Sequence, residues 1–285
     1  MSVPEIIYLG PEGTYSSQVA QKRYKRNRVA YKCFSTVREI CEYVAAKPSR
    51  KGVVPIENSS SGYIYQTVDA LLDEAMSLEI EEEISVNVKL ALLGRKGKEI
   101  KRIYSHEAPL KHCEQWLKKK YPKAERIPVN STATAASHAS ENSQSAAISS
   151  RSTAAIYDLD VLRCPIPPGS KLPNVTDFFV ISRKCLSFPR KKKTSLGVRL
   201  LNKPGALCDF LIPFKDAGLN LSRIVSRPAS GIPRRPMERE YAFFIDVNES
   251  MEKPILKSVL AKAGKHAAVI RKLGSYPSHR VYHSL

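Results

Sequence analysis

The sequence predicts an α/β protein with a second, smaller unit at its C-terminus. Two observations lead to this prediction. Short apolar runs are followed four times by a polar loop and then by an apolar pattern with helical spacing. The chain then turns basic and proline-containing from residue 183 to residue 193, and a new pattern begins near residue 196. With 285 residues, about twice the usual domain length, the chain has room for both units.

The first part of the chain repeats one local order of elements. A strand is expected at Glu5–Leu9, a tight loop at Gly10–Gly13, and a helix that begins near Tyr15 with Thr14 as its cap. The order of strand, loop and helix recurs in three more segments, which start at Gly52, Ile103 and Ala146. Such alternation implies a mostly parallel sheet, in which ligands bind where polar loops leave the carboxyl ends of strands. Those loops are the first candidates for a site.

The second part of the chain has a different order. A strand is expected at Gly197–Leu201, followed by a turn and by the apolar face of a helix from Ala206 to Phe214. The remaining elements are two strands, a helix and a last strand, expected at Leu219–Val225, Tyr241–Val247, Ile255–Ala263 and Ala268–Ile270. The order strand, helix, strand, strand, helix, strand is the ferredoxin-like plan.

Composition excludes several classes of protein. Apolar residues make up 42% of the chain and charged residues 26%, which is typical of a globular protein. The net charge of +19 is spread over both parts without a zinc-finger or aromatic-basic motif, so we expect a solvated basic surface and no nucleic-acid partner. No apolar run approaches the ~18–20 residues that span a bilayer and no signal segment is seen, which predicts a cytoplasmic protein with no membrane partner. The six cysteines show no Cys-x-x-Cys spacing, so no metal site is expected.

Short motifs along the chain form an ordered series. In the first part they are Gly10–Ser16, Gly52–Ser59 with Gly62 and Thr67, Tyr104–His106, Ser131–Ala133, Ala146–Ile148, and Asn174–Thr176 before Phe178. In the second part they are Gly205–Leu207, Ser226–Pro228, Tyr241–Asp246 and Leu273–Pro277. Together, in this order and spacing, they resemble the prephenate dehydratases, a family with a two-lobed catalytic region and a C-terminal ACT regulatory domain. The resemblance covers essentially the whole chain.

The resemblance implies a fold and a reaction. The implied fold is α/β, with a two-lobed, periplasmic-binding-protein-like catalytic domain around a ligand cleft at residues 1–183, a linker at 184–195 and a ferredoxin-like ACT domain at 196–285. The implied reaction removes carbon dioxide and water from prephenate to give phenylpyruvate in phenylalanine biosynthesis, with no metal or organic cofactor. Aromatisation drives this step, so the protein has mainly to hold the dianion and to protonate the departing hydroxyl. Phenylalanine is the implied allosteric ligand, and a homodimer or homotetramer is expected.

The resemblance also assigns site residues. Thr176 is the expected proton donor. Substrate binding is expected at polar loops that offer small hydroxyl and amide groups and helix N-termini, with the residues Thr14, Glu57, Asn58, Ser59, Ser105, Ser131, Thr132, Asn174 and Phe178. The regulatory ligand is expected at Gly205, Ala206, Leu207, Ser226, Arg227 and Pro228. Helix capping stays open as an alternative role for Thr14, Ser105 and Ser131, and His106 and His112 are expected to be structural or on the surface.

Three positions depart from the family pattern. Asp177 stands where the family usually has arginine, Leu90 where many members have histidine, and Val225 where a glutamate usually precedes Ser-Arg-Pro. Asp177 is therefore a candidate specificity residue, although alternation along a strand is expected to turn it away from Thr176. Val225 is expected to weaken the binding of phenylalanine. Dehydration of arogenate, decarboxylation of prephenate without aromatisation, and a catalytically silent amino-acid sensor remain as alternatives.

Overall fold

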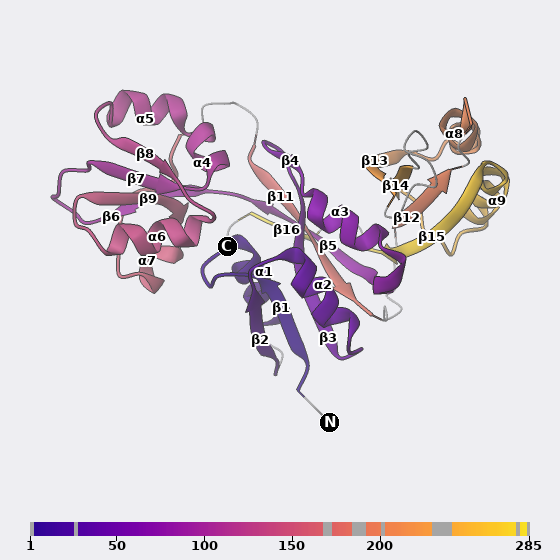
Figure 1. The fold of residues 1–285 in the computed structure, drawn as a ribbon, viewed down its shortest axis with the longest axis horizontal. Coiled ribbons are helices and arrows are strands. Elements are labelled where there is room, and N and C mark those ends of the chain that lie inside the picture. The colour runs from indigo at the N-terminus through magenta and orange to yellow at the C-terminus, as the bar shows by residue number, and fades with distance from the viewer. Residues whose placement is uncertain are drawn as a thin grey trace.

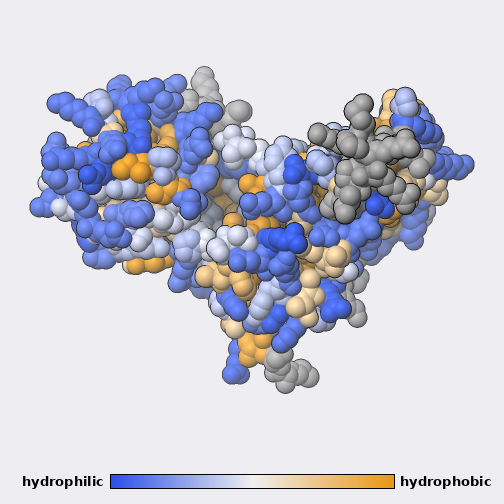
Figure 2. Space-filling view, in the orientation of Figure 1, coloured by the Kyte–Doolittle hydropathy of each residue, from blue (hydrophilic) through white to orange (hydrophobic). Residues whose placement is uncertain are grey.

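The computed structural model describes residues 3–25, 28–167, 173–183, 192–200, 203–229, 241–277 and 280–283. It consists of lobe one (3–87, 175–182 and 280–282), lobe two (90–166) and a C-terminal unit (193–276), with lobe one in the middle (Figure 1). The face drawn in Figure 2 is mostly hydrophilic. No helix among the described residues is long and apolar enough to cross a membrane. Most of the expected linker, residues 184–191, lies outside the described residues, as does the expected strand end at Leu201.

Lobe one is built on a seven-stranded sheet with the order β16-β5-β11-β3-β1-β2, in which β4 also pairs with β3. The strands in this sheet are β1 (Glu5–Leu9), β2 (Ala30–Phe34), β3 (Arg50–Asn58), β4 (Gly62–Tyr63), β5 (Glu79–Asn87), β11 (Val175–Ser182) and β16 (Arg280–Tyr282). Its helices are α1 (Tyr15–Tyr24), α2 (Val37–Ala45), α3 (Tyr65–Leu72) and the short 3₁₀-helix η1 (Glu74–Met76). The predicted strand, loop and helix at the start of the chain are confirmed, and Thr14 caps α1.

Lobe two is built on a five-stranded sheet with the order β10-β6-β9-β7-β8. Its strands are β6 (Leu90–Gly94), β7 (Arg102–Ser105), β8 (Glu125–Pro128), β9 (Ser145–Ser150) and β10 (Asp160–Arg163). Its helices are α4 (Glu107–His112), α5 (Glu114–Lys120), α6 (Thr132–Ser140) and α7 (Thr153–Ile156).

The prediction of a mostly parallel sheet is wrong, because both sheets are mixed. In lobe one β1 is parallel to β2 and β3, but β11 is antiparallel to β3 and β5. In lobe two β7 is parallel to β8 and β9, but β6 is antiparallel to β9 and β10. The chain passes from β5 to β6 and returns from β10 to β11, so the strands at these crossings run against their neighbours.

The C-terminal unit confirms the predicted order of elements. It contains β12 (Lys193–Leu200), α8 (Ala206–Asp216), β13 (Leu221–Pro228), β14 (Tyr241–Val247), α9 (Pro254–Ala263), η2 (Gly264–His266) and β15 (Ala267–Tyr276). These strands form an antiparallel sheet with the order β13-β14-β12-β15. One element differs from the expected division of the chain: β16, at the end of the range expected for this unit, pairs in parallel with β5 of lobe one.

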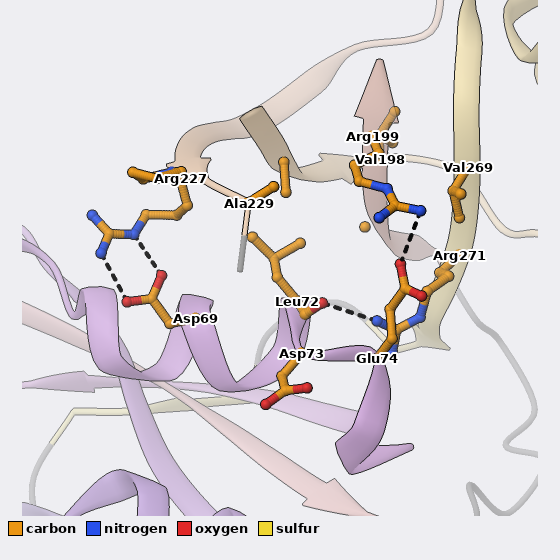
Figure 3. Close-up of a pocket in the computed structure, with 13 residues that line it drawn as sticks. Asp69, Leu72, Asp73, Glu74, Val198, Arg199, Arg227, Ala229, Val269 and Arg271 are labelled. Carbon is orange, nitrogen blue, oxygen red and sulfur yellow. Dashed lines mark hydrogen bonds and ion pairs between the residues drawn. The ribbon is translucent and has the colours of Figure 1, made fainter. Parts of the chain in front are cut away.

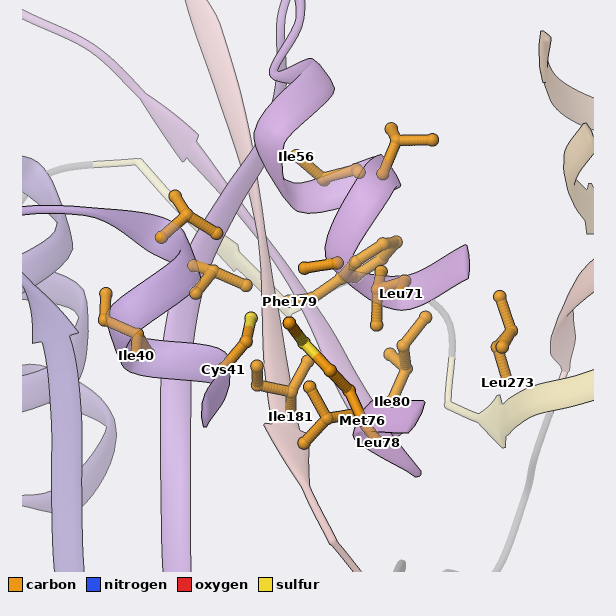
Figure 4. Close-up of a cluster of buried hydrophobic side chains, with 14 of the residues drawn as sticks. Ile40, Cys41, Ile56, Leu71, Met76, Leu78, Ile80, Phe179, Ile181 and Leu273 are labelled. Atoms are coloured by element: carbon orange, nitrogen blue, oxygen red, sulfur yellow. The ribbon is translucent and has the colours of Figure 1, made fainter. Parts of the chain in front are cut away.

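Lobe one and the C-terminal unit share one apolar core (Figure 4). Phe179 of β11 has its ring centroid 6.1 Å from that of Phe244 and 6.0 Å from that of Tyr276, both in the C-terminal unit. A Cβ atom built on Gly274 of β15 would clash with the backbone oxygen of Ile80. The two units are therefore in direct van der Waals contact, and side chains of the C-terminal unit can reach the sheet that carries Thr176.

Candidate active site

A cavity of about 230 Å³ lies between the two lobes. Lobe one contributes Tyr15, Pro55, Asn58, Ile64, Thr176 and Phe178, and lobe two contributes Leu90, His106, His112, Ser131 and Thr132. Asn174, just before β11, also lines it. Six of the predicted residues are brought together here: Asn58, Ser131, Thr132, Asn174, Thr176 and Phe178.

Asn58 ends β3 and organises the polar groups of the cavity. Its Nδ2 donates to Thr176 Oγ1 at 2.9 Å and to Asn174 Oδ1 at 2.8 Å. Its Oδ1 accepts from the backbone N–H groups of Ser60 at 2.9 Å and Ser61 at 3.0 Å. Because the register of β11 with β3 sets Thr176 opposite Asn58, the sheet itself brings these two side chains together. With its oxygen accepting from Asn58, Thr176 keeps its hydroxyl proton for donation to a ligand.

Lobe two presents the N-terminus of α6 to the cavity. Ser131 caps this helix, its Oγ accepting from the N–H of Thr134 at 3.0 Å, and it also lines the cavity together with Thr132. A helix N-terminus carries partial positive charge and unpaired N–H groups, which suit a carboxylate. The described residues that line the cavity include neither lysine nor arginine. Attraction for an anion therefore comes from N–H and hydroxyl donors and from the two histidines.

Four predicted binding residues do not line this cavity, Glu57 among them, and the other three use their hydroxyl groups elsewhere. Thr14 caps α1, and its hydroxyl donates to the carbonyl of Leu9 at 2.8 Å. Ser105 is buried, and its hydroxyl donates to the carbonyl of Ile148 at 2.7 Å. The Ser59 hydroxyl is bound to the backbone at the start of β11, where it accepts a hydrogen bond from the N–H of Val175 at 2.9 Å. The capping alternative thus describes Thr14, whereas Ser131 both caps a helix and lines the cavity.

Glu57 and Asp177 point away from the cavity. Glu57 Oε2 lies 2.9 Å from Nε of Arg223 in the C-terminal unit, so its placement among the cleft residues is wrong. Asp177 Oδ1 accepts from the hydroxyl of Ser85 at 2.6 Å, and its Oδ2 lies 3.4 Å from Nη2 of Arg223. The expected orientation of Asp177 is confirmed, because alternation along β11 puts Thr176 in the cavity and Asp177 on the opposite face of the sheet.

The sequence did not place several of the lining residues in the cleft: Tyr15, Ser60, Ser61, Ile64, Val88 and Leu90. His106 and His112 also line it, and His106 is exposed and caps α4, which agrees with the structural or surface role expected for it. The Tyr15 hydroxyl donates to the carbonyl of Lys89 at 3.0 Å, which ties α1 to the crossing between the lobes. Desolvation raises the pKa of the Tyr15 phenol, so this group stays neutral. Two features of the sequence indicate these residues. Ser60 and Ser61 lie in the polar loop after β3, and Val88 and Leu90 lie at the crossing from lobe one to lobe two.

The residues predicted to bind a regulatory ligand lie in two different places. Arg227 and Pro228 line a cavity of about 430 Å³ between α3 and the C-terminal sheet, which Gly205, Ala206 and Leu207 do not line (Figure 3). Arg227 is engaged there by Asp69 of α3 through two hydrogen bonds. Val225 is buried in the core shared with lobe one, so the position is not on a ligand-binding surface within the chain.

Two lobes with a cavity between them that is lined by hydroxyl and amide groups are typical of α/β proteins that bind a small ligand in an interlobe cleft. The family model described as prephenate dehydratase matches residues 6–186, and the chain belongs to this family. The bifunctional chorismate mutase/prephenate dehydratase of Pseudomonas aeruginosa is 38% identical over 275 residues, which cover 96% of this chain and 73% of that protein.

Solved structures of similar chains share the whole fold. A prephenate dehydratase from Arthrobacter aurescens in complex with L-Phe is 31% identical with a TM-score of 0.83, over 96% of this chain and 89% of that one. GqqA, described as a novel type of quorum quenching acylase, is 25% identical with a TM-score of 0.82, over 96% of this chain and 97% of that one. The similarity therefore includes the C-terminal unit as well as the two lobes.

Proposed function

We propose that this chain binds prephenate in the interlobe cleft and converts it to phenylpyruvate, carbon dioxide and water. The observation that carries this proposal is the 2.9 Å hydrogen bond from Asn58 Nδ2 to Thr176 Oγ1 inside the cavity. In the reaction, the bond between the ring and its carboxylate breaks, and its electron pair enters the ring as the 4-hydroxyl leaves. That hydroxyl takes one proton and departs as water, so the dianion becomes a monoanion.

Thr176 is the proton donor in this proposal. A threonine hydroxyl is a weak acid, and the Asn58 amide helps because its N–H stabilises the negative charge that develops on Oγ1 as the proton leaves. The N-terminus of α6 with Ser131 and Thr132 would hold a substrate carboxylate. Phe178 and Leu90 supply apolar surface for the ring.

Removal of the Thr176 hydroxyl tests the proposal. Thr176→Ala is expected to lower kcat for prephenate by at least ~10²-fold, the usual contribution of a general acid, with Thr176→Ser as the control that keeps a hydroxyl. Formation of phenylpyruvate is followed by absorbance, and circular dichroism checks the fold of each variant. Full activity of Thr176→Ala would exclude Thr176 as the acid.

The alternatives on substrate and product are separated by one assay. The purified chain is incubated with prephenate and with arogenate, and the products are identified by mass. Because Asp177 is held behind the sheet by Ser85 and Arg223, we propose prephenate as the substrate and expect Asp177→Asn to change kcat/KM for both substrates alike. A gain confined to one substrate would make Asp177 a specificity residue. A non-aromatic product would indicate the decarboxylase, and no product the silent sensor.

Regulation is proposed to act through the C-terminal unit, as an ACT domain that binds phenylalanine between two copies of the chain in a homodimer or homotetramer. Support comes from the edge strand β13 with exposed Ile224 and from α8, where Leu207 and Ile212 are 36% and 43% exposed. Gly205 has a φ of 81° at the start of α8, a conformation that lets a ligand approach the backbone closely. A monomer in light scattering at micromolar concentration would contradict the proposed homodimer or homotetramer. Inhibition by phenylalanine and a cytoplasmic location stay predictions.

A further inference from the structure

Two carboxylates lie side by side on the face of the lobe one sheet that points away from the cleft. Glu57 precedes Asn58 on β3, Asp177 follows Thr176 on β11, and the register sets Glu57 opposite Asp177. Like charges directly opposite each other on antiparallel strands repel. The repulsion would push apart the two strands that bring Asn58 and Thr176 together, at a place where a register shift between Asp177 and Phe178 already interrupts the pairing.

Arg223 lies between these two carboxylates. Its Nε is 2.9 Å from Glu57 Oε2, its Nη2 is 3.4 Å from Asp177 Oδ2, and its Nη1 contacts both Glu83, at 3.2 Å, and Asp246. The side chain is 4% exposed. Burial alone would lower the pKa of Arg223, but the charges of Asp246 and Glu83 and the bond to Glu57 raise it above the ordinary value. The guanidinium is therefore a permanent cation, and its fork geometry allows it to serve several carboxylates at once.

This cation comes from the C-terminal unit. Arg223 is on β13, whereas Glu57 and Asp177 belong to lobe one. Lys193 supplies a second cation for the buried carboxylates, with its Nζ 2.8 Å from Glu83 Oε2 and 3.3 Å from Asp246 Oδ2. In the described part of the chain, Glu57 and Asp177 each form an ion pair with Arg223. Arg223 is thus the side chain of the C-terminal unit that links the two carboxylates directly behind Asn58 and Thr176.

We propose that Arg223 is a positioning residue of the cleft, which bridges Glu57 and Asp177 from behind the sheet, offsets their mutual repulsion and so keeps Asn58 and Thr176 at hydrogen-bond distance. The C-terminal unit then influences turnover without touching the substrate, since its docking delivers the guanidinium. The inference rests on the proposed dehydratase activity. It predicts a larger effect on kcat than on KM. A misplaced proton donor stabilises the transition state less, whereas the other cleft residues still bind the substrate.

A second arginine provides a matched control. Arg271 of β15 also crosses from the C-terminal unit to lobe one, where it donates to the carbonyl of Leu72 at 3.0 Å (Figure 3). Leu72 is the last residue of α3, so this hydrogen bond is made to a helix and not to β3 or β11. Arg271 belongs neither to the residues that line the cleft nor to those expected to bind a regulatory ligand. Loss of Arg271 therefore reports the cost of a weakened interface.

The test measures kcat and KM for prephenate in the full chain, its Arg223→Gln, Arg223→Lys and Arg271→Gln variants, and the double variant Arg223→Gln with Asp177→Asn. We expect Arg223→Gln to lower kcat by about 10- to 100-fold with KM within about threefold, and Arg223→Lys to fall between this variant and wild type. Arg271→Gln should stay within about threefold of wild type. The double variant should recover several-fold in kcat, because it removes one of the two repelling charges, an effect that a merely structural role would not produce.

The outcomes decide the inference separately from the function. Unchanged kcat in Arg223→Gln, a loss equal to that of Arg271→Gln, or no recovery in the double variant would overturn the role of Arg223 while an active wild type upholds the dehydratase. A wild type that does not consume prephenate would overturn both. Should Arg223→Gln fail to fold, Arg223→Lys carries the same test, since lysine keeps the charge but loses the fork: wild-type kcat in that variant refutes positioning by several simultaneous contacts.

Discussion

Asn58→Asp is the sharpest perturbation of the cleft, because it keeps the shape of the side chain and exchanges its amide donor for a charge. Asn58 Nδ2 donates to Thr176 Oγ1 and Asn174 Oδ1, and both bonds are lost in the variant. An aspartate would also place a negative charge near a substrate carboxylate. At ~5 Å and an effective dielectric constant of ~20, two unit charges repel by about 3 kcal/mol. This corresponds to roughly 10²-fold weaker binding.

The assay is steady-state turnover of prephenate together with urea unfolding. We expect kcat/KM to fall by at least about 10²-fold, and the free energy of unfolding to fall by about 1–3 kcal/mol because Asn174 Oδ1 then faces another acceptor. Asn142→Asp is the control: it adds the same charge at an exposed position, where Oδ1 still accepts from the N–H of Gln144. Asn58→Asp with kcat/KM within about threefold of the Asn142→Asp value would refute the role given to Asn58.

Two further predictions concern the core. Gly274→Ala should lower the free energy of unfolding by about 1–3 kcal/mol, because its Cβ would clash with the Ile80 backbone oxygen; an unchanged urea midpoint would show that β15 can shift at no cost. Burial raises the pKa of Cys113 from 9.0 to about 12. The contribution of its protonated thiol to the free energy of unfolding is therefore fully present below pH 9.0 and is lost as the pH rises toward 12. At pH 8 the buried Cys113 should resist alkylation while the exposed Cys33 and Cys208 react, as mass spectrometry of the labelled chain will show.

The parts of the site that are local in sequence could be predicted. Strand alternation alone put Asp177 on the opposite face from Thr176, and capping chemistry alone explains Thr14. The order of elements in the C-terminal unit likewise follows from runs of apolar residues and turns. Identification of Asn58 and Thr176 needed the resemblance to a family, since many asparagines and threonines end strands without serving a site.

The parts that depend on docking could not be predicted. Glu57 lies in a motif beside Asn58, and nothing local indicates that its partner is Arg223, 166 residues further along the chain. Val225 looked like an altered ligand contact, yet it is buried in the core between lobe one and the C-terminal unit. His106 and His112 carry no spacing signal, and they reach the cavity only because lobe two folds over lobe one. Each of these placements is decided by how separate units pack, which leaves no periodic trace in the sequence.

The position of β16 gives the C-terminal unit an unusual relation to the rest of the chain. The chain leaves lobe one at the end of β11 and returns to it at β16. In its topology the C-terminal unit is therefore inserted into lobe one rather than attached to its end. Cutting the chain after β11 would remove the outer strand of the sheet and leave β5 with an unpaired row of N–H and C=O groups. A shortened chain would then expose a sheet edge that can pair with another chain, so its loss of activity would reflect self-association as well as the loss of Arg223 and of regulation. An internal deletion that joins β11 to β16 through a designed loop keeps that edge covered.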